Sequence, residues 1–587
     1  MKYRLLTGSS LAVLGLALTA PAQAQAPGDD AFVALAHDYI ERSLVLHPED
    51  ATSLGDHRHD TRLADYGASA LAAELDGDRV LLVKLGGIDI AGLTGPNRLD
   101  ARLLRNELEG RIFTLTQLRP AVRNPITYEA SYADGLYLLV ARDFAPAAER
   151  LRSAEGRLRD IPRVLAQARA NLDNPARIFT ETAIERADGA IDQVRHGFDD
   201  LIAQAPEMRA EMAPFQEQAA RALTDYRNWL KRDLLPRSNG DFRVGEKAFR
   251  QELRHTLVSA LSPEEILARA QADVKRTTDQ LYDAAAPLYR RYFPGAPAAD
   301  LADRRHVIKA VLDRIADNRP NQDTIVPRAG AILKEATEFV REHDLVTLPS
   351  TPVKLIVMPE FKRGTSVAYC DWPGALEKNG ETFYAISPTP KNWPPARRIS
   401  FYREYNDAML HDLTVHEAMP GHYLQGAHAN QFKAPTLIRA VLQNGAFIEG
   451  WAVYCEQMMA EHGFGGPEER MEQLKMRLRV AINAILDQKI HTAGMTEKEA
   501  VALMMRDGFQ EEGEAVGKWK RAQLTSTQLS TYFVGVSEWL DLRAAAQAKL
   551  GAAFDLKRFN DTALSFGSPP VKFVREEMGL GQAQGLD

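Results

Sequence analysis

The sequence predicts a mostly α-helical protein with one small β-sheet in its second half. Long stretches rich in Ala, Leu, Arg and Glu place apolar residues three to four positions apart, for example over 147–170 and 181–205, which is typical of amphipathic helices. Short β-prone runs separated by Pro, Gly and Asn gather between residues 350 and 390. After residue 404 the helical pattern returns. The fold class is therefore mostly α, with the sheet inserted between two helical parts.

The first 24 residues have the features of a cleavable secretory signal peptide. Lys2 and Arg4 precede an apolar run over 11–20, and small residues follow up to Ala24, which is the order expected of such a leader. Cleavage after Ala24 or after Ala26 fits equally well, and no cysteine stands at the junction for lipid attachment. The apolar run is shorter than the roughly 20 residues that span a bilayer, so an uncleaved anchor is the weaker alternative. We expect export to the periplasm and no stable membrane insertion once the signal is removed.

The mature chain divides by its pattern into a helical amino-terminal region over 25–345 and a catalytic region over 346–587. In the first region, Ser262 before Pro263 has the form of a helix N-cap with proline at the first helical position. The second region begins with the β-prone runs of 350–390, which follow one another with turns between them and predict a small antiparallel sheet. We expect helices to follow this sheet.

The composition fits a soluble globular enzyme. Of the 587 residues, 45% are hydrophobic and 26% are charged, and the formal net charge is −7. A protein that binds nucleic acid is expected to carry a basic footprint, so nucleic acid is not an expected partner. The only cysteines are Cys370 and Cys455, which are too few for a scaffold held by disulfides. The sequence leaves open whether they pair, and it leaves the oligomeric state open.

The heptapeptide His-Glu-Ala-Met-Pro-Gly-His begins at His416 and ends at His422, and Glu449 follows 27 residues later. Two histidines and one glutamate with an open fourth position are a recurring ligand set of catalytic Zn²⁺. We therefore predict that His416, His422 and Glu449 bind one Zn²⁺ ion. Glu417, next to the first ligand, is the predicted general base that deprotonates a water at the metal.

The spacing of the two histidines requires a distortion of the helix. In the familiar H-E-x-x-H motif the histidines are four apart and share one helix face, whereas here they are six apart. On a regular helix the second imidazole would point about 120° away from the first and lie about 9 Å further along the axis. Pro420 removes a backbone donor, and Gly421 tolerates backbone angles that other residues avoid. We predict a bulge or break over 419–421 that brings His422 back towards His416.

A second helix is predicted over 447–456, where apolar residues recur at positions i, i+3, i+4 and i+7. Glu449 and Glu456 are seven residues apart in this helix, so they lie two turns apart on nearly the same face. Glu449 is the predicted metal ligand. Glu456 has two open interpretations: it accepts a hydrogen bond from a ligand imidazole, or it is an ordinary solvated or ion-paired carboxylate.

The runs H-E-A-M-P-G-H-Y-L-Q over 416–425 and F-I-E-G-W-A-V-Y-C-E over 447–456 resemble the bacterial domain-of-unknown-function family 885, which belongs with the gluzincin-type metallopeptidases. Weaker similarity covers nearly the whole mature chain, from His-Pro-Glu-Asp-Ala-Thr at 47–52 to Ser-Pro-Pro at 568–570. The resemblance implies a large multi-helix gluzincin-like peptidase fold. It also implies that the sheet precedes the active-site helix and that its edge strand receives a peptide as an added strand. A sheet that only covers the core fits the same residues.

Two further site residues follow from the same resemblance. The family's Pro-Gly-Gln-Ala-Leu-Ser-Tyr is Ser-Thr-Gln-Leu-Ser-Thr-Tyr here, ending at Tyr532, which is expected to donate a hydrogen bond to the oxyanion. The alternative for Tyr532 is a buried core tyrosine. The family's Asp-Thr-Gly-Ile-His is Asp-Gln-Lys-Ile-His here, so Asp487 is expected to orient His491, a candidate catalytic residue. A family histidine near the end is Asn560 here, and no role is assigned to it.

These residues predict an exported zinc hydrolase that cleaves peptide bonds of short peptides by metal-activated water. The same ligands would also accept Mn, Co or Fe. Two other classes stay open: a metal-dependent amidase or esterase acting on non-peptide substrates, and a periplasmic protein that binds peptide or metal without turnover. Glu417 argues against the last class, because metal storage needs no base beside a ligand. Exo- or endopeptidase action is open, since no charged residue stands out as a clamp for a substrate terminus.

Overall fold

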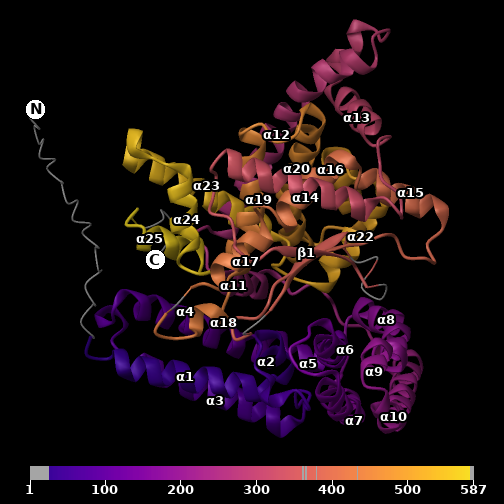
Figure 1. Ribbon diagram of the computed structural model, residues 1–587, viewed down its shortest axis with the longest axis vertical. Helices are drawn as coiled ribbons and strands as arrows, with labels where there is room; N and C mark the ends of the chain where they lie inside the picture. The colour runs from indigo at the N-terminus through magenta and orange to yellow at the C-terminus, as the bar shows by residue number, and fades with distance from the viewer. Residues whose placement is uncertain (1–25, 360–362, 364–365, 378–379, 433, 582–587) are drawn as a thin grey trace, which may run out of the picture.

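The computed structural model describes residues 26–359, 363, 366–377, 380–432 and 434–581 (Figure 1). The predicted signal peptide lies outside the described residues. Most of the described chain is helical, as predicted, and its strands form a three-stranded sheet. Over these same residues, no helix is both long enough and apolar enough to cross a membrane.

The first ten α-helices form the lower part of the molecule in Figure 1 and contain two hydrophobic cores. One core joins α1 to α4 and includes Phe32 and Leu104. The other joins α6, α7, α8 and α10 and includes Tyr128 and Leu158. The helices are α1 (Asp29–Leu46), α2 (Pro48–Leu54), α3 (Ala68–Gly86), α4 (Gly95–Phe113), α5 (Pro120–Arg123), α6 (Ile126–Ala141), α7 (Ala147–Asn171), α8 (Arg177–His196), α9 (Asp199–Gln204) and α10 (Arg209–Trp229).

The next four helices pack against the second half of the chain. They are α11 (Glu246–Leu257), α12 (Pro263–Tyr292), α13 (Arg304–Ile315) and α14 (Ile325–Glu342). The largest core combines Phe249 of α11 and Ile332 of α14 with residues of the sheet and of the helices after it. The predicted division near residue 345 therefore does not coincide with a division between cores. Helix α12 begins as predicted: the Ser262 hydroxyl accepts a hydrogen bond from the Glu265 amide (3.2 Å), and the Glu265 carboxylate accepts one from the Ser262 amide (2.8 Å).

The sheet is mixed, so the prediction of an antiparallel sheet is wrong in part. Its strands are β1 (Val353–Val357), β2 (Ala368–Asp371) and β3 (Thr382–Ile386), in the order β1-β3-β2. Strand β3 is antiparallel to β2 but parallel to β1. The physical reason is the path of the chain between β2 and β3, which first reaches the amino-terminal helices, where the Leu376 amide donates to the Leu54 carbonyl (2.7 Å). The chain then returns between the two earlier strands.

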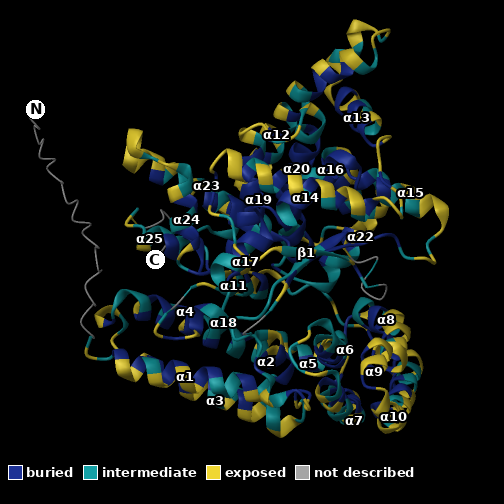
Figure 2. Ribbon diagram, in the orientation of Figure 1, coloured by how far each residue is buried: buried dark blue, intermediate teal, exposed yellow. Residues whose placement is uncertain are grey.

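The remaining helices form the buried centre of the molecule and cover it. They are α15 (Pro395–Glu404), α16 (Asp407–Glu417), α17 (His422–Ala429), α18 (Ile438–Val441), α19 (Gly445–Glu461), α20 (Pro467–Ala493), α21 (Glu497–Asp507), α22 (Glu512–Leu524), α23 (Ser530–Leu550), α24 (Leu556–Leu564) and α25 (Val571–Glu577). Helices α16, α19 and α20 run through the dark blue, buried interior in Figure 2. Functional side chains on these helices are therefore held by packing on several sides.

Candidate metal centre

The helix break predicted between the two histidines is present. Helix α16 ends at Glu417 and α17 begins at His422, and the peptide bond before Pro420 is cis. The Gly421 amide donates back to the Val415 carbonyl (2.9 Å), and a Cβ atom at Gly421 would clash with the backbone carbonyl of His416. Only glycine fits this close approach. The break begins at residue 418, one residue earlier than predicted.

Helix α19 anchors the break from the other side. The Pro420 carbonyl accepts a hydrogen bond from the Trp451 indole (2.9 Å) and a weaker one from the Cys455 thiol (3.6 Å). Trp451 and Cys455 are four residues apart, so one face of α19 holds the turn between the histidines. Glu449 lies on the preceding turn of the same helix. Trp451, two residues after Glu449, therefore helps to position the loop between the two imidazoles.

The structure brings the three predicted metal ligands together. One potential ligand atom of each of His416, His422 and Glu449 lies within 4.8 Å of the other two. The Glu449 Oε2 atom is 3.6 Å from His416 Nε2 and 3.4 Å from His422 Nε2. The two imidazole rings are nearly perpendicular, with centroids 4.7 Å apart. Both imidazole Nε2 atoms thus face the same carboxylate oxygen.

This geometry fits a tetrahedral zinc site. Ligands about 2.1 Å from a common Zn²⁺ at a tetrahedral angle are separated by about 3.4 Å, close to both measured separations. Glu449 Oε2 is buried and has no hydrogen-bond partner among the described residues. A buried carboxylate oxygen without a partner is costly, and a cation between the three ligands would satisfy it. The donor set, two nitrogens and one oxygen, suits Zn²⁺.

Glu456 fixes the orientation of the first imidazole. Its carboxylate accepts a hydrogen bond of 2.6 Å from Nδ1 of His416, and its side chain is fully buried. Donation from Nδ1 leaves Nε2 of His416 free to face the centre. The alternative of a solvated surface carboxylate for Glu456 is therefore excluded by its burial.

The electrostatics of the cluster also favour a cation. Burial alone would lower the pKa of His416, but its contacts with Glu449 and Glu456 outweigh burial and raise this pKa well above the ordinary value. Burial likewise acts to raise the pKa of Glu449, but its contacts with His416 and His422 lower it on balance. The carboxylates thus retain positive charge on a buried imidazole. A metal ion would supply positive charge at the same place.

Glu417 lies between the cluster and the sheet. It is the last residue of α16, and its charge helps to raise the pKa of His416. It also adds to the effect of burial in raising the pKa of Cys370 on β2 and of Tyr384 on β3. Glu417 therefore follows the first ligand directly, on a helix that packs against strand β2, and this placement is compatible with a base acting on a water at a bound metal.

Tyr532 lies near a close crossing between its own helix α23 and helix α19, which carries Glu449. A Cβ atom at Gly450 of α19 would clash with Gly535 of α23, and the reverse substitution would clash with α19. Tyr532 lies three residues before Gly535, and Glu449 is next to Gly450, so both residues lie near this contact. Burial, followed by the charge of Glu449, raises the pKa of Tyr532.

The Tyr532 hydroxyl is held in place by two donors. It accepts hydrogen bonds from Arg521 Nη2 (3.0 Å) and Gln528 Nε2 (3.3 Å). Because both contacts use oxygen lone pairs, the hydroxyl hydrogen stays available for donation. This arrangement suits a residue that stabilises an oxyanion.

The predicted pair of Asp487 and His491 is not formed, which corrects the expectation for these residues. Asp487 accepts hydrogen bonds from the amides of Thr527 and Ser530 (both 3.0 Å). His491 Nε2 instead lies 2.9 Å from the carbonyl of Thr525. Over the described ranges, His491 is also outside the group that could hold a metal. Both side chains bond to the backbone between residues 522 and 530, and the catalytic role predicted for His491 stays a prediction.

Other residues at the site were not predicted. Trp372, directly after β2, packs against Gly426 so closely that a Cβ there would lie 2.8 Å from the indole, and its ring centroid is 6.3 Å from that of His422. The Tyr384 hydroxyl is bonded to the hydroxyl of Thr414 (3.0 Å), which ties β3 to α16. In the sequence, the glycine at position 426, four residues after His422, is the signal that could have indicated a close side-chain contact on this face of α17.

The two thiols are not joined to each other, and Asn560 links three segments of the chain. Cys370 and Cys455 are both free, so the question of a disulfide left open by the sequence is answered. Asn560 is fully buried, accepts a hydrogen bond from the Tyr454 hydroxyl (3.1 Å) and donates to the Leu345 carbonyl (2.9 Å). Its amide therefore joins α24 to α19 and to the end of the segment after α14.

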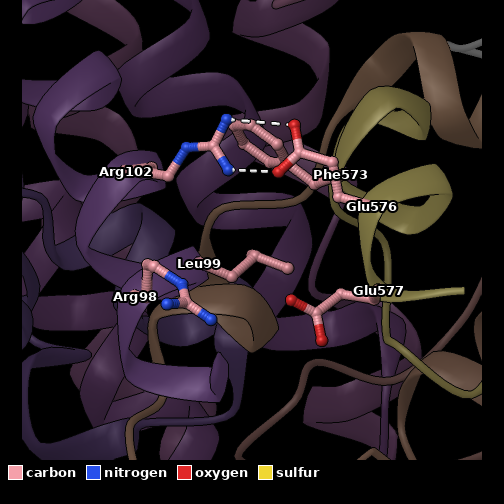
Figure 3. Close-up of a pocket in the computed structure, with 6 residues that line it drawn as sticks. All are labelled: Arg98, Leu99, Arg102, Phe573, Glu576 and Glu577. Carbon is pink, nitrogen blue, oxygen red and sulfur yellow. Dashed lines mark hydrogen bonds and ion pairs between the residues drawn. The ribbon is translucent and has the colours of Figure 1, made fainter. Parts of the chain in front are cut away.

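A cavity of about 290 Å³ lies between α4 and α25, away from the metal centre (Figure 3). Arg102 and Glu576 bridge it with hydrogen bonds of 2.6 and 3.2 Å, and the Arg102 guanidinium lies 4.1 Å from the centre of the Phe573 ring. The charges that form this bridge satisfy each other. The cavity lies at the contact between α4 and α25, and no chemistry is assigned to it.

Comparison with known proteins identifies relatives of the whole chain. Residues 48–578 match the family described as "Bacterial protein of unknown function (DUF885)". A solved structure of a "putative lipoprotein of unknown function" from Shewanella oneidensis is 31% identical, with a TM-score of 0.77 over 93% of this chain and 99% of that chain. A "putative lipoprotein" from Colwellia psychrerythraea, 17% identical, shares the fold with a TM-score of 0.76 over 94% of this chain and 99% of its own. None of the curated proteins matches this chain.

Proposed function

This chain belongs to the DUF885 family of bacterial proteins of unknown function, and on that premise we propose that it is a zinc-dependent hydrolase cleaving peptide bonds of short peptides. The observation that carries the proposal is the convergence of ligand atoms from His416, His422 and Glu449 within 4.8 Å of one another. Glu417 stands beside the first of them. Because a His-Glu pair, a second His and a Glu on a packed helix form the ligand order of gluzincin-type peptidases, we propose that the fold is related to that group.

Each residue at the centre has a distinct task in this proposal. A bound Zn²⁺ supplies Lewis acidity, which polarises a carbonyl and lowers the pKa of a coordinated water towards about 7. Glu417 accepts the proton of the attacking water and delivers it to the leaving amine. Tyr532 donates a hydrogen bond to the oxygen on which negative charge develops. Glu456 keeps His416 Nε2 directed at the centre through the 2.6 Å contact with Nδ1.

Strand β2 is the proposed docking edge for the peptide. It lies at the end of the sheet order, pairs with β3 on one side and contacts both α16 and α17. An extended peptide that added to its other side would use main-chain hydrogen bonds and so accept many sequences. Trp372 follows β2 and lies beside His422, so it would cover the end of the bound peptide that is nearest the metal ligands.

Export is part of the proposal. The leader predicted over the first 24 residues is one support, and the description of two structural relatives as lipoproteins is the other. We propose that the enzyme acts on peptides in the periplasm.

The test combines metal analysis with turnover of a peptide library, read by mass spectrometry. We expect one Zn²⁺ per wild-type chain and cut peptides. Glu417→Gln keeps the metal and loses turnover, whereas His422→Ala loses both. His428→Ala is the matched control, because His428 lies on the same helix α17 and bonds only to the Thr347 carbonyl (2.9 Å) among the described residues. Undiminished turnover in metal-loaded Glu417→Gln protein would refute the role of Glu417 as base.

The same assay separates the hydrolase classes. A panel of short peptides, non-peptide amides and esters is offered to the zinc-loaded wild type. Cleavage of peptides supports the proposal, and cleavage confined to esters or non-peptide amides replaces it with the second hydrolase class. If the protein binds zinc but turns over none of these substrates, the alternative of a protein that binds peptide or metal without catalysis is supported instead.

A further inference from the structure

Three basic side chains gather beside Tyr532. Arg479 comes from α20, and Lys518 and Arg521 come from α22, where their spacing of three residues places them on one face. Arg521 Nη2 donates to two neutral groups, the Tyr532 hydroxyl (3.0 Å) and the Gln528 side-chain carbonyl (2.8 Å). The positive charges of Arg479 and Arg521 both disfavour the charged form of Lys518. The group therefore places concentrated positive charge next to the proposed oxyanion donor.

The acidic residues nearby do not balance these cations. Within the part of the chain that the structure describes, no carboxylate lies within 4.0 Å of the Arg521 guanidinium. Lys518 is 3.8 Å from Glu514 Oε1, and the same oxygen is already ion-paired with Arg479. Glu404 lies 3.7 Å from Arg479 and is shared with another cation of α20. Among the described residues the positive charge of Arg521 is thus unpaired, and Lys518 shares the Glu514 oxygen with Arg479.

Burial makes this imbalance significant. The Lys518 side chain is 7% exposed. Burial, followed by the charges of Arg479 and Arg521, lowers the pKa of Lys518 well below that of an ordinary lysine. Cations with so little compensation are unfavourable in a protein interior unless an anion joins them. An anionic ligand would relieve the repulsion and restore the charge on Lys518.

We propose that Arg521 and Lys518 bind the terminal carboxylate of the peptide, so that the enzyme removes residues from the carboxyl end of its substrates. This inference rests on the proposed hydrolase function. A guanidinium presents N–H groups in a planar fork that matches a carboxylate, and within the described part of the chain only Nη2 of Arg521 donates a hydrogen bond. The cationic group of Lys518 adds charge on the same face of α22.

The position of Tyr532 sets the length of the released fragment. Its hydroxyl contacts Arg521, and the close crossing at Gly450 and Gly535 brings its helix against the one that carries Glu449. An extended chain advances about 3.3 to 3.6 Å per residue, so a carboxylate at Arg521 lies one or two residues beyond a carbonyl beside Tyr532. Hydrolysis breaks that amide C–N bond: the water oxygen adds to the carbonyl carbon, and a proton passes to the nitrogen. The products are a shortened peptide and a free amino acid or dipeptide.

A pair of peptides tests the proposal. Both have the same sequence and an acetylated amino end, and one ends in a free carboxylate where the other ends in an amide. For the zinc-loaded wild type we expect kcat/KM to be roughly 10- to 100-fold higher for the free acid, the loss expected for a hydrogen-bonded charged group, with one or two residues released. Arg521→Gln brings the ratio of the two rates towards one, and Lys518→Gln lowers it by less.

Lys520→Gln is the matched control. It removes the same charge from the same helix, but Lys520 pairs with Glu185 and its side chain is 38% exposed. The ratio between free acid and amide should stay at its wild-type value in this variant. Equal rates for the two peptides in the wild type, or an unchanged ratio in Arg521→Gln, would overturn the proposal.

A binding measurement separates this inference from the proposed function. Calorimetry on zinc-loaded Glu417→Gln protein should give tighter binding of the free acid than of the amide, and adding Arg521→Gln should remove the difference. If the difference is present but no wild-type turnover is seen, the hydrolase proposal fails and the carboxylate site stands. If turnover occurs and neither binding nor rate distinguishes the peptides, the carboxylate site fails alone.

Discussion

Two ionic clusters in this protein differ in how completely their charged and polar groups are paired by hydrogen bonds and ion pairs. In the first, between α4 and α18, Asp100 accepts hydrogen bonds from Arg439 Nε and from the Thr436 hydroxyl, both 2.5 Å long. Both charged side chains are almost fully buried, at 0% and 3% exposure. Arg439 also donates to backbone carbonyls of Pro96 and Phe566 (both 3.4 Å). Each charge meets its opposite, and the cluster joins distant parts of the chain.

The metal centre is less deeply buried, with side-chain exposures of 17% for His416, 10% for His422 and 22% for Glu449, and its polar groups are incompletely paired. In it, Glu449 Oε2, Glu456 Oε2 and His422 Nδ1 are buried atoms without a hydrogen-bond partner among the described residues. The Glu449 oxygen also lies centrally between two imidazoles. Because buried polar groups are normally paired, the difference agrees with a structural role for the first cluster and with the ligand that we propose for the second.

The sharpest way to break the first cluster is Asp100→Asn, which leaves the Arg439 charge buried and uncompensated. Removing one partner of a buried ion pair costs about 3 to 5 kcal/mol of unfolding free energy, measured by urea denaturation. Asp76→Asn is the control, because Asp76 is 73% exposed and pairs with Arg79 on the surface; its change should stay below about 1 kcal/mol. A comparably small effect of Asp100→Asn would remove the contrast between the clusters.

Zinc should complete the second cluster and stabilise the fold. At a free Zn²⁺ concentration about 1,000 times Kd, the unfolding free energy of the wild type should rise by about 4 kcal/mol. His422→Ala protein should gain little, because one of the three ligands is missing. Asp100→Asn should gain as much as the wild type, since its cluster does not take part. Equal gains in wild type and His422→Ala would show that zinc binds elsewhere.

The crossing of α19 and α23 gives a smaller effect on stability and a larger one on activity. Gly535→Ala forces a Cβ against the backbone of α19, and such overpacking costs about 1 to 3 kcal/mol. Since Tyr532 lies one turn away, turnover by the folded protein should also fall. Gly517→Ala on α22 is the control, because a Cβ there has open space and alanine favours helix by up to about 1 kcal/mol. Wild-type turnover in folded Gly535→Ala protein would contradict this role of the crossing.

The sequence was sufficient for those parts of the site that depend on local chemistry. The mostly α-helical class followed from periodicity, and the break between His416 and His422 followed from their spacing and from Pro420 and Gly421. The start of α12 at Ser262 was a local signal of the same kind. In each case, residues within a few positions of one another determine the backbone.

The parts that depend on distant packing could not be predicted. Asp487 and His491 have the spacing of a pair, but Asp487 bonds to amides near residue 530, about 40 positions away, so spacing alone was misleading. The parallel pairing of β1 with β3 depends on where the connecting segment meets α2. The basic group at Arg521 had no signal either, because the lack of an acidic partner is visible only in three dimensions.

His57 is intermediate between the fully paired Asp100–Arg439 cluster and the incompletely paired metal centre, because its own ion pairing depends on pH. Its ring nitrogens contact Asp60 (2.9 Å) and Glu377 (3.2 Å), which joins the amino-terminal helices to the segment before β3. Burial acts to lower the pKa of His57, but these two carboxylates outweigh it and raise the pKa. A raised pKa stabilises the fold below the unfolded value of about 6.5, and this contribution is lost as pH rises through the folded value.

His57→Gln should therefore cost more stability at pH 5.5 than at pH 8. The side chain is 29% exposed, so the pH-dependent part should be about 1 kcal/mol or less, the smallest effect predicted for these clusters. The ring also stacks on Phe144, with centroids 3.7 Å apart, and losing this contact lowers stability equally at both pH values. Urea denaturation of wild type, His57→Gln and the surface variant His196→Gln separates the two contributions. If the loss of stability in His57→Gln grew with pH, the neutral imidazole, and not the charged one, would be the form that stabilises the contact between Asp60 and Glu377.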